Sequence, residues 1–321
     1  MAESSKSAEA LPRSVAGGGA VFKHQTVRDL AWAVSSPSLM SAVAGMQIRD
    51  SLWTSREPQD FRDWLMALDA EPSALLNRME ARSGKQVGLY FEDLLAFWLE
   101  VGSPYQLLAR NLQVHQGKIT KGAFDFILET PVETFEHWEV TVKFYLQSEA
   151  ATSWEKWIGP GARDRLDIKM DRMRDHQLPL SSSDVGKEAL YPITGDRPIA
   201  QRAVTKGQFF SYWHGKENLP DGANSKNTVG AWLKNKEMEA FAEMHPEAFY
   251  CRRDKPSWLA PLIAHRDEVQ NPIEWMEEYR ARHGDKPVMF SLMKGDPEFM
   301  REVKRIFVVP NSWPSSAKRT R

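Results

Sequence analysis

The sequence predicts an α/β protein in which a central mixed sheet is flanked by helices, with an α+β arrangement as the alternative. Segments with apolar residues at helical spacing are interspersed along the chain with segments whose polar and apolar residues alternate as in strands. At 321 residues with 42% hydrophobic content, the chain can form one large domain or two ordinary ones.

Composition divides the chain into five parts. The small, polar N-terminal residues and the basic C-terminal residues cannot bury enough surface to order themselves. A Ser- and Gly-containing stretch near 181–198 indicates a further boundary. The predicted parts are a disordered tail (1–20), an N-terminal helical region (21–84), a core (85–180), a C-terminal α/β region (181–313) and a disordered basic tail (314–321).

The helices and strands follow in order. Residues 61–68 and 87–101 place apolar side chains at helical spacing, and Glu92 lies beside the second apolar stripe. Strands are expected at 107–115, 122–128 and 136–146, with turns at Gly117 and Gly122, and a helix at 163–178. In the C-terminal region we expect strands at 206–213, 287–293 and 305–310 and helices at 231–244, 271–283 and 296–305.

Composition also limits the function classes. The formal net charge is only −1, so any binding to phosphate requires a local patch. The single cysteine, Cys251, excludes internal disulfides and multi-cysteine metal sites, and we interpret it as a plain buried thiol. No secretory signal is evident and no segment approaches the ~20 apolar residues of a membrane span. We therefore expect a cytoplasmic protein without a membrane partner.

Ionisable residues interrupt two of the predicted strands. Because side chains alternate between the faces of a strand, Asp125, Glu139 and Lys143 can share one face of a hairpin. Apolar residues occupy the other face: Phe124, Phe126, Leu128, Trp138, Val140, Val142 and Phe144. The sequence thus predicts a sheet with one charged face and one apolar face.

This charged face has two interpretations. In ordinary antiparallel sheets one face is solvated, and its charges pair only weakly across strands. If the helix that carries Glu92 partly covers the face, the charges instead line a cleft. Two carboxylates with waters can hold Mg²⁺, and a lysine can orient an attacking water or offset charge on a phosphate. That combination suits the hydrolysis of phosphodiester bonds.

With these residues the sequence resembles the PD-(D/E)XK phosphodiesterase superfamily. Glu92 matches the superfamily's helix acid, residues 122–125 match the aspartate strand, and Glu139 with Lys143 matches the acid-lysine strand. More closely, segments from YFEDLLAFWL to FVVPNSWP resemble an uncharacterised bacterial domain family of unknown function that spans most of the chain.

The superfamily resemblance implies a restriction-endonuclease-like core and nuclease activity on DNA or RNA. It implies that Asp125 and Glu139 bind Mg²⁺ or Mn²⁺, with Lys143 and Glu92 as further catalytic residues. Two features depart from the pattern. Ala123 stands where a Glu is usual, and Glu139 and Lys143 are four residues apart instead of two, about 13 Å along a strand. The alternative is an inactive nucleic-acid-binding or protein-interaction module on the same fold.

The helix at 163–178 carries a basic row beside an acidic one. The basic row is Arg165, Lys169, Arg172 and His176, and the acidic row is Asp164, Asp167, Asp171 and Asp175. Interleaved charges favour a solvated helix with ion pairs over a phosphate-binding face. Lys169 is the expected exception, since its position resembles a basic residue often found on the superfamily's following helix, and Arg165 is the second phosphate-binding candidate. His137 shares the charged face and is expected to be solvated at its rim.

Overall fold

The computed structural model describes residues 22–50, 52, 58–82, 84–282, 286–296 and 299–314. The predicted disordered tail at 1–20, and all but the first residue of the one at 314–321, lie outside these ranges. Within them the chain forms a mixed sheet flanked by helices, so the predicted α/β class is confirmed.

The sheet has ten strands in the described part of the chain, in the order β1-β2-β3-β5-β6-β10-β9-β7, with β4 paired to β3 and β8 to β10. Neighbours from β3 to β10 along this order run parallel, whereas the pairs on either side are antiparallel. The strands are β1 (Gln106–Gln116), β2 (Ile119–Glu129), β3 (Phe135–Gln147), β4 (Trp157–Ile158), β5 (Ile199–Tyr212), β6 (Val229–Lys234), β7 (Phe249–Arg253), β8 (Ile263–Ala264), β9 (Val288–Gly295) and β10 (Met300–Val309).

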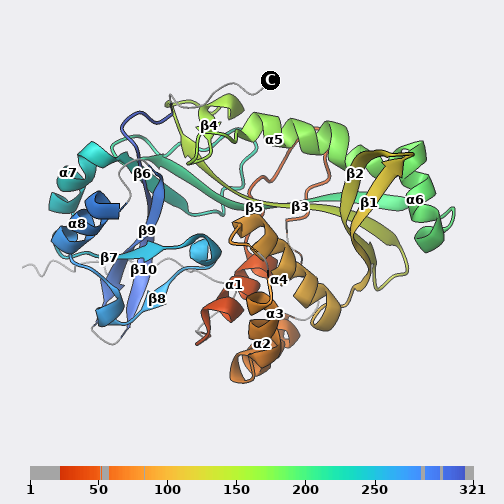
Figure 1. The fold of residues 1–321 in the computed structure, drawn as a ribbon, viewed down its shortest axis with the longest axis horizontal. Helices are drawn as coiled ribbons and strands as arrows, with labels where there is room; N and C mark the ends of the chain where they lie inside the picture. The colour runs from red at the N-terminus through yellow and green to blue at the C-terminus, as the bar shows by residue number, and fades with distance from the viewer. Residues whose placement is uncertain are drawn as a thin grey trace, which may run out of the picture.

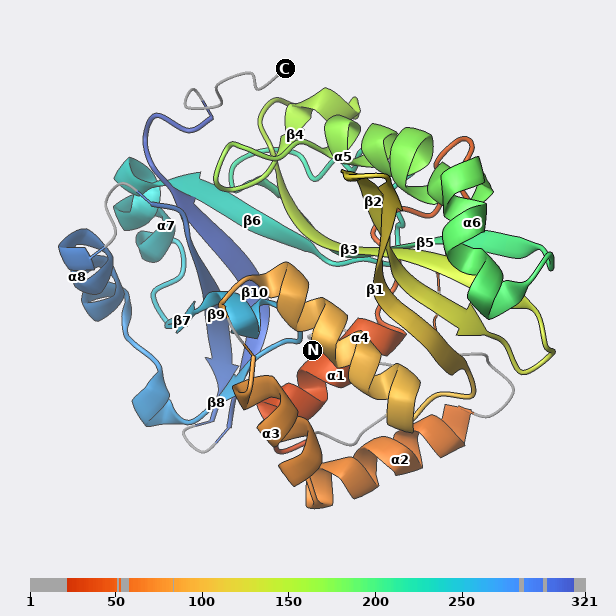
Figure 2. The ribbon, with the colours of Figure 1, turned by 45° about the vertical axis from the view of Figure 1, so that its right-hand side comes forward.

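Helices cover both faces of the sheet. Helices α1 to α4 lie below it in Figure 1, α5 lies above it, α6 lies beside β1 and β2, and α7 and α8 lie at the far end (Figures 1 and 2). The helices are α1 (Gln25–Ser35), α2 (Pro58–Ala70), α3 (Ser73–Glu80), α4 (Val87–Val101), α5 (Leu166–Arg172), α6 (Asp184–Thr194), α7 (Met238–Glu243) and α8 (Pro272–Arg282). Among the residues described, no helix is long and apolar enough to cross a membrane.

The main core lies between the lower helices and the central strands. Trp98 and Phe91 of α4 pack with Trp138 and Phe144 of β3, and all four are nearly or fully buried. The apolar stripe that predicted α4 is therefore the stripe that meets the sheet. A separate, smaller core around Tyr145 lies on the other side of β3, under α5.

Strands from the predicted core and C-terminal regions join in one sheet. Strand β5 pairs with β3 in parallel register from Phe135 opposite Ile199 to Leu146 opposite Phe210. The predicted helix at 231–244 begins too early, and the one at 296–305 is wrong over the residues that the structure describes. Residues 231–234 belong to β6, with α7 starting only at Met238, and residues 300–305 belong to β10. The pairing of β10 with β6 on one side and β9 on the other outweighs the local helical pattern of β10, as tertiary context often outweighs propensity.

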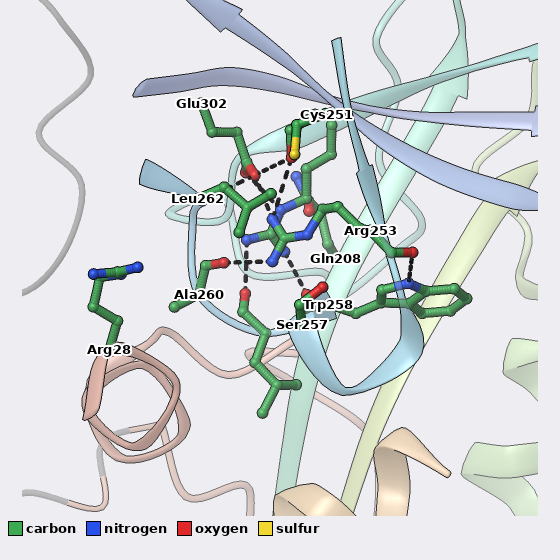
Figure 3. A network of polar contacts seen from close by, with 12 residues as sticks. Arg28, Gln208, Cys251, Arg253, Ser257, Trp258, Ala260, Leu262 and Glu302 are labelled. Carbon is green, nitrogen blue, oxygen red and sulfur yellow. Dashed lines mark hydrogen bonds and ion pairs between the residues drawn. The ribbon is translucent and has the colours of Figure 1, made fainter. Parts of the chain in front are cut away.

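A buried ionic network ties the N-terminal helices to the C-terminal strands. Arg253 donates hydrogen bonds to Glu302 and, at 2.6 Å, to the carbonyl of Ala260 (Figure 3). Arg305 donates to the same Glu302 carboxylate at 2.7 Å. On the helix side, Asp29 of α1 accepts from the Ala260 N–H at 2.9 Å. The two arginines lower the pKa of Glu302 to about 2 despite its burial.

Candidate functional site

The site lies where β2 separates from β3. These strands pair only from Phe126 opposite Trp138 to Glu129 opposite Phe135, although both are longer. At the first unpaired position, the Oδ2 atom of Asp125 accepts a 2.9 Å hydrogen bond from the backbone N–H of Val140. The Asp125 carboxylate thus lies in the fork between β2 and β3. It accepts a hydrogen bond from a backbone N–H of β3 that no longer has a partner on β2.

At the same point, the regular alternation of β2 side chains between the two faces of the sheet is interrupted. Phe126 packs in the main core beside α4, whereas Phe124 packs with His137, with ring centroids 4.8 Å apart, on the opposite side. The prediction that Phe124 and Phe126 share one face is therefore wrong. Asn111, which lies between the partners of these two residues on β1, has a φ of 48°, and the change of face coincides with this irregularity.

Neutral side chains hold both carboxylate oxygens of Glu139. His137 Nε2 lies 2.9 Å from Oε1, and Gln177 Nε2 donates to Oε2 at 2.6 Å. Gln177 in turn accepts a 2.9 Å hydrogen bond from Lys169 Nζ. The side chains of Glu139 and His137 have no exposed surface. The expectation that His137 is solvated is wrong, because the chain after α5 covers it.

The segment that covers His137 directly follows α5 and has a different helix type. A π-helical turn, Met173–Gln177, and a 3₁₀ turn, Leu178–Ser182, continue α5 over the start of β2. Gly122, predicted as a turn residue, lies inside β2, and a Cβ atom there would stand 2.9 Å from Leu180 Cδ2. Its lack of a side chain allows this close approach. The turn glycine of the hairpin is Gly117, as predicted.

The helix that carries Glu92 covers the apolar face of β3, so the prediction that it encloses the charged face is wrong. Glu92 reaches the fork from that opposite side, where its charge interacts with those of Asp125 and Lys169. The next residue, Asp93, forms ion pairs with Arg82 and with Arg110 of β1. Glu92 and Lys169 thus approach Asp125 from α4 and α5.

Burial and mutual charge shift the titration of this cluster. Burial raises the pKa of Asp125 to about 7, and the charge of Glu139 adds to that rise. Burial likewise raises the pKa of Glu139 to about 7, although the charge of Lys169 opposes it. Burial and the charge of Asp125 raise the pKa of Glu92 to about 7. Perturbed acids of this kind gather at functional sites more often than elsewhere.

The predicted basic residues have different surroundings. Lys143 is bound to Asp164 in an ion pair, and both side chains are partly exposed. Lys169 is half-buried, and burial with the charge of Lys143 lowers its pKa, against the charges of Glu139 and Asp125. Arg165 pairs with Asp167, in agreement with the expected ion-paired helix. Of the basic candidates, Lys169 is linked to Glu139 by hydrogen bonds, because it donates to Gln177 and Gln177 donates to Glu139.

The carboxylate pair suits a hard cation with water ligands. Among the described residues, no group of three or more His, Cys, Asp or Glu side chains is arranged to hold a metal ion. Asp125 and Glu139 offer carboxylate oxygens whose charges repel one another in a buried setting, and a cation would relieve this repulsion. Mg²⁺ is commonly bound by one or two carboxylates with waters completing its shell.

Sequence analysis missed the polar residues around Glu139. Gln177 and Ser181 lie in the covering turns, and their polar side chains carried no motif. The sequence places His137 on the correct face, but its burial depends on the turns that follow α5, where Ser181 contacts its ring.

A family model described as a domain of unknown function (DUF1853) matches residues 28–309. The match covers most of the chain, as its resemblance to an uncharacterised domain family led us to expect. No curated protein and no solved structure gave a match. The PD-(D/E)XK resemblance stays a prediction.

Proposed function

The chain belongs to the DUF1853 family of domains of unknown function, and we propose that it is a metal-dependent phosphodiesterase that hydrolyses nucleic-acid backbones. The observation that carries this proposal is the fork between β2 and β3, where the buried and charge-coupled carboxyls of Asp125 and Glu139 lie beside Lys169. The superfamily resemblance of the same residues supports it.

Asp125 and Glu139 would hold Mg²⁺ or Mn²⁺ through their carboxylate oxygens. Such a cation, when bound, supplies positive charge that polarises a phosphoryl oxygen. The Val140 N–H holds the Asp125 carboxylate, and Gln177 holds that of Glu139. Neither carboxylate would therefore have to become ordered when the cation binds. Glu92 adds a third negative charge from α4.

Lysine residues would balance the charge that develops on the phosphate. Lys169 is restrained by Gln177 and interacts electrostatically with both acids of the pair. Lys143 is the residue that the superfamily pattern assigns to this role, and here Asp164 binds it. Either ammonium group would also favour binding of the anionic backbone of DNA or RNA, the proposed partners. A cytoplasmic location is part of the proposal and agrees with the single cysteine.

One observation favours a second function, an inactive nucleic-acid-binding or protein-interaction module on the same fold. Glu139 has no exposed side-chain surface, and both its oxygens are already hydrogen-bonded. In such a module the polar cluster would serve only to hold α5 and its following turns on the sheet.

Cleavage assays distinguish the two functions. Single- and double-stranded DNA and RNA are incubated with the full chain and Mg²⁺, Mn²⁺ or EDTA. We expect metal-dependent cleavage that falls by about 100-fold or more in Asp125→Asn and Glu139→Gln, since a bound cation is worth several kcal/mol in the transition state. Asp171→Asn, an exposed carboxylate on α5, is the matched control and should keep full activity. Inactivity on every substrate, or cleavage unchanged in both variants, would exclude the proposed site.

A further inference from the structure

A hollow with a volume of about 390 Å³ lies where the end of α3 meets the first turns of α4. The side chains that line it are Arg78, Ala81, Arg82, Leu89 and Asp93. Two of them are guanidinium groups and only one is a carboxylate. Because the net charge of the whole chain is only −1, a local excess of positive charge of this kind is what binding to phosphate requires.

One carboxylate, that of Asp93, is shared by two arginines. Arg82 Nε donates to its Oδ2 at 2.6 Å, and Arg110 of β1 donates to its Oδ1. Arg78, in contrast, has both Nη atoms bonded to the two carboxylate oxygens of Glu100. Arg78 is therefore matched by one acid, whereas Arg82, Arg110 and Asp93 together carry a net charge of +1.

Arg82 is held in place but keeps donors for a ligand. Its guanidinium carbon lies 5.1 Å from the centroid of the Tyr90 ring, and the Tyr90 hydroxyl donates a 2.9 Å hydrogen bond to Asp29. Within the part of the chain that the structure describes, Nη1 of Arg82 forms no hydrogen bond, and Nη2 forms only a long one of 3.5 Å to the Gln86 carbonyl. A guanidinium group fixed in this way can bind a phosphate oxygen without first becoming ordered.

The first turn of α4 adds to the positive character of the hollow. Leu89 of this turn lines the hollow, the turn contains no acidic residue, and Gln86 before it forms no side-chain cap hydrogen bond. The free N–H groups at the start of a helix carry partial positive charge, which favours an anion there.

Arg110 lies between the hollow and the fork. Helix α4 packs beside β1 (Figure 2), and Arg110 is the β1 partner of Phe126, which follows Asp125 in β2. Its guanidinium carbon lies 6.0 Å from the centroid of the Phe126 ring. Residues 101–124 include no Asp or Glu, whereas the Arg and Lys residues of that stretch are all exposed: Arg110, Lys118 and Lys121. The surface that leads away from the fork is therefore basic.

We propose that Arg82 in the hollow and Arg110 beside it bind backbone phosphates of a nucleic-acid strand that extends from the fork across the start of α4. The choice of a nucleic acid as ligand rests on the proposed function. Guanidinium groups match phosphate oxygens through paired N–H donors. Asp93 competes with the phosphates for both arginines, so its removal strengthens binding.

Equilibrium binding in EDTA tests the site without cleavage. Fluorescein-labelled single-stranded DNA and RNA oligonucleotides are titrated with the full chain, and inorganic phosphate is titrated separately as a competitor. We expect Arg82→Gln and Arg110→Gln each to weaken oligonucleotide binding by about 10- to 100-fold, the range for a charge-assisted hydrogen bond. Arg301→Gln removes an exposed arginine from β10, away from β1 and β2 in the sheet, and should bind as the parent does.

Two further readouts would not respond to a merely structural role. Each phosphate contact contributes about 0.7 to the slope of log affinity against log salt for a single strand, so each arginine variant should lose about that much slope. Asp93→Asn should tighten binding by about threefold or more, since it removes the competing carboxylate. A structural role alone predicts unchanged or weaker binding in Asp93→Asn.

The outcomes separate this proposal from the proposed function. Parent-like affinity and salt slope in folded Arg82→Gln and Arg110→Gln would overturn the proposal, as would unchanged or weaker binding in Asp93→Asn. Should Arg82→Gln fail to fold, the other two variants decide. No oligonucleotide binding by the parent, or inorganic phosphate that binds as tightly as the oligonucleotides, would also overturn it. Arginine-dependent binding by a parent that cleaves no substrate would support the site and refute the proposed hydrolysis.

Discussion

The backbone N–H of Val140 donates a 2.9 Å hydrogen bond to Oδ2 of Asp125, one position beyond the last pair formed by β2 and β3. This contact holds a carboxylate in the plane of the sheet at the point where the two strands diverge. Glu139 lies next to Val140 in the chain, so the same fork sets the position of both acids.

The raised pKa values predict a specific dependence of stability on pH. The folded-state pKa of Asp125 is about 7, against an ordinary value of 3.8, so the folded chain holds the proton more tightly than the unfolded chain does. The resulting stabilisation is complete below about pH 4 and is lost progressively as the pH rises from about 4 to above 7. Asp125→Asn, whose amide oxygen can still accept from Val140, should remove this loss.

We expect Asp125→Asn to raise the free energy of unfolding at pH 8 by on the order of a few kcal/mol without metal, and to give little gain at pH 4, close to the pKa of the unfolded chain. Urea denaturation in EDTA between pH 4 and pH 8 measures both values, with the exposed Asp171→Asn as control. A parallel pH dependence in parent and variant would show that Asp125 titrates normally.

The two lysines should contribute unequally to cleavage. Lys169 is bonded to Gln177 beside Glu139, whereas Lys143 is occupied by Asp164. We expect Lys169→Met to reduce the single-turnover cleavage rate by about 100-fold, as expected for loss of a charge at the reacting phosphate, and Lys143→Met by less than about tenfold. The opposite order would favour the assignment of Lys143 that the superfamily pattern makes.

The buried ionic network should stabilise the fold strongly when complete. Glu302 receives hydrogen bonds from Arg253 and Arg305, and all three side chains are nearly or fully buried. Glu302→Gln leaves two guanidinium groups without their counter-charge, and we expect a loss of about 3 to 5 kcal/mol in urea denaturation. The exposed pair Lys304–Glu217 offers a control, since Glu217→Gln should cost less than about 1 kcal/mol. Similar small losses in both variants would contradict this account of the network.

A side chain at Gly122 should press against the Leu180 side chain. A Cβ atom at Gly122 would stand 2.9 Å from Leu180 Cδ2, so Gly122→Val is expected to destabilise the chain by about 1 to 3 kcal/mol through overpacking. The double variant Gly122→Val, Leu180→Ala should lose less than the sum of the two single losses, which thermal and urea unfolding can measure. Strict additivity would show that the 3₁₀ turn does not press on β2 at this point.

Much of the fold could be predicted from local pattern. The apolar stripe at 87–101 predicts α4, and the alternation of polar and apolar residues predicts β1, β2 and β3, although β3 is buried on both faces. Strand β10 was misassigned because the burial of its residues comes from β6 and β9, which are distant in sequence. A single sequence carries no direct signal for such pairing.

The candidate site, like the fold, was predictable only where local alternation determines it. Spacing placed Glu139 and Lys143 on one side of β3, but Asp125 lies in the plane of the fork and Phe124 and Phe126 face opposite sides. The irregularity at Asn111 and the end of strand pairing cause this, and neither appears in an alternation pattern. Gln177 reaches Glu139 only because α5 continues as a π-helical turn, a change of helix type that local sequence did not indicate.

Anomalous diffraction from crystals soaked in Mn²⁺ tests the central claim most directly. We predict an anomalous peak between the carboxyl oxygens of Asp125 and Glu139, absent from crystals of Asp125→Asn soaked in the same way. No peak at the fork at saturating Mn²⁺, or a peak only elsewhere on the molecule, would contradict the proposal that these two residues form a metal-dependent phosphodiesterase site.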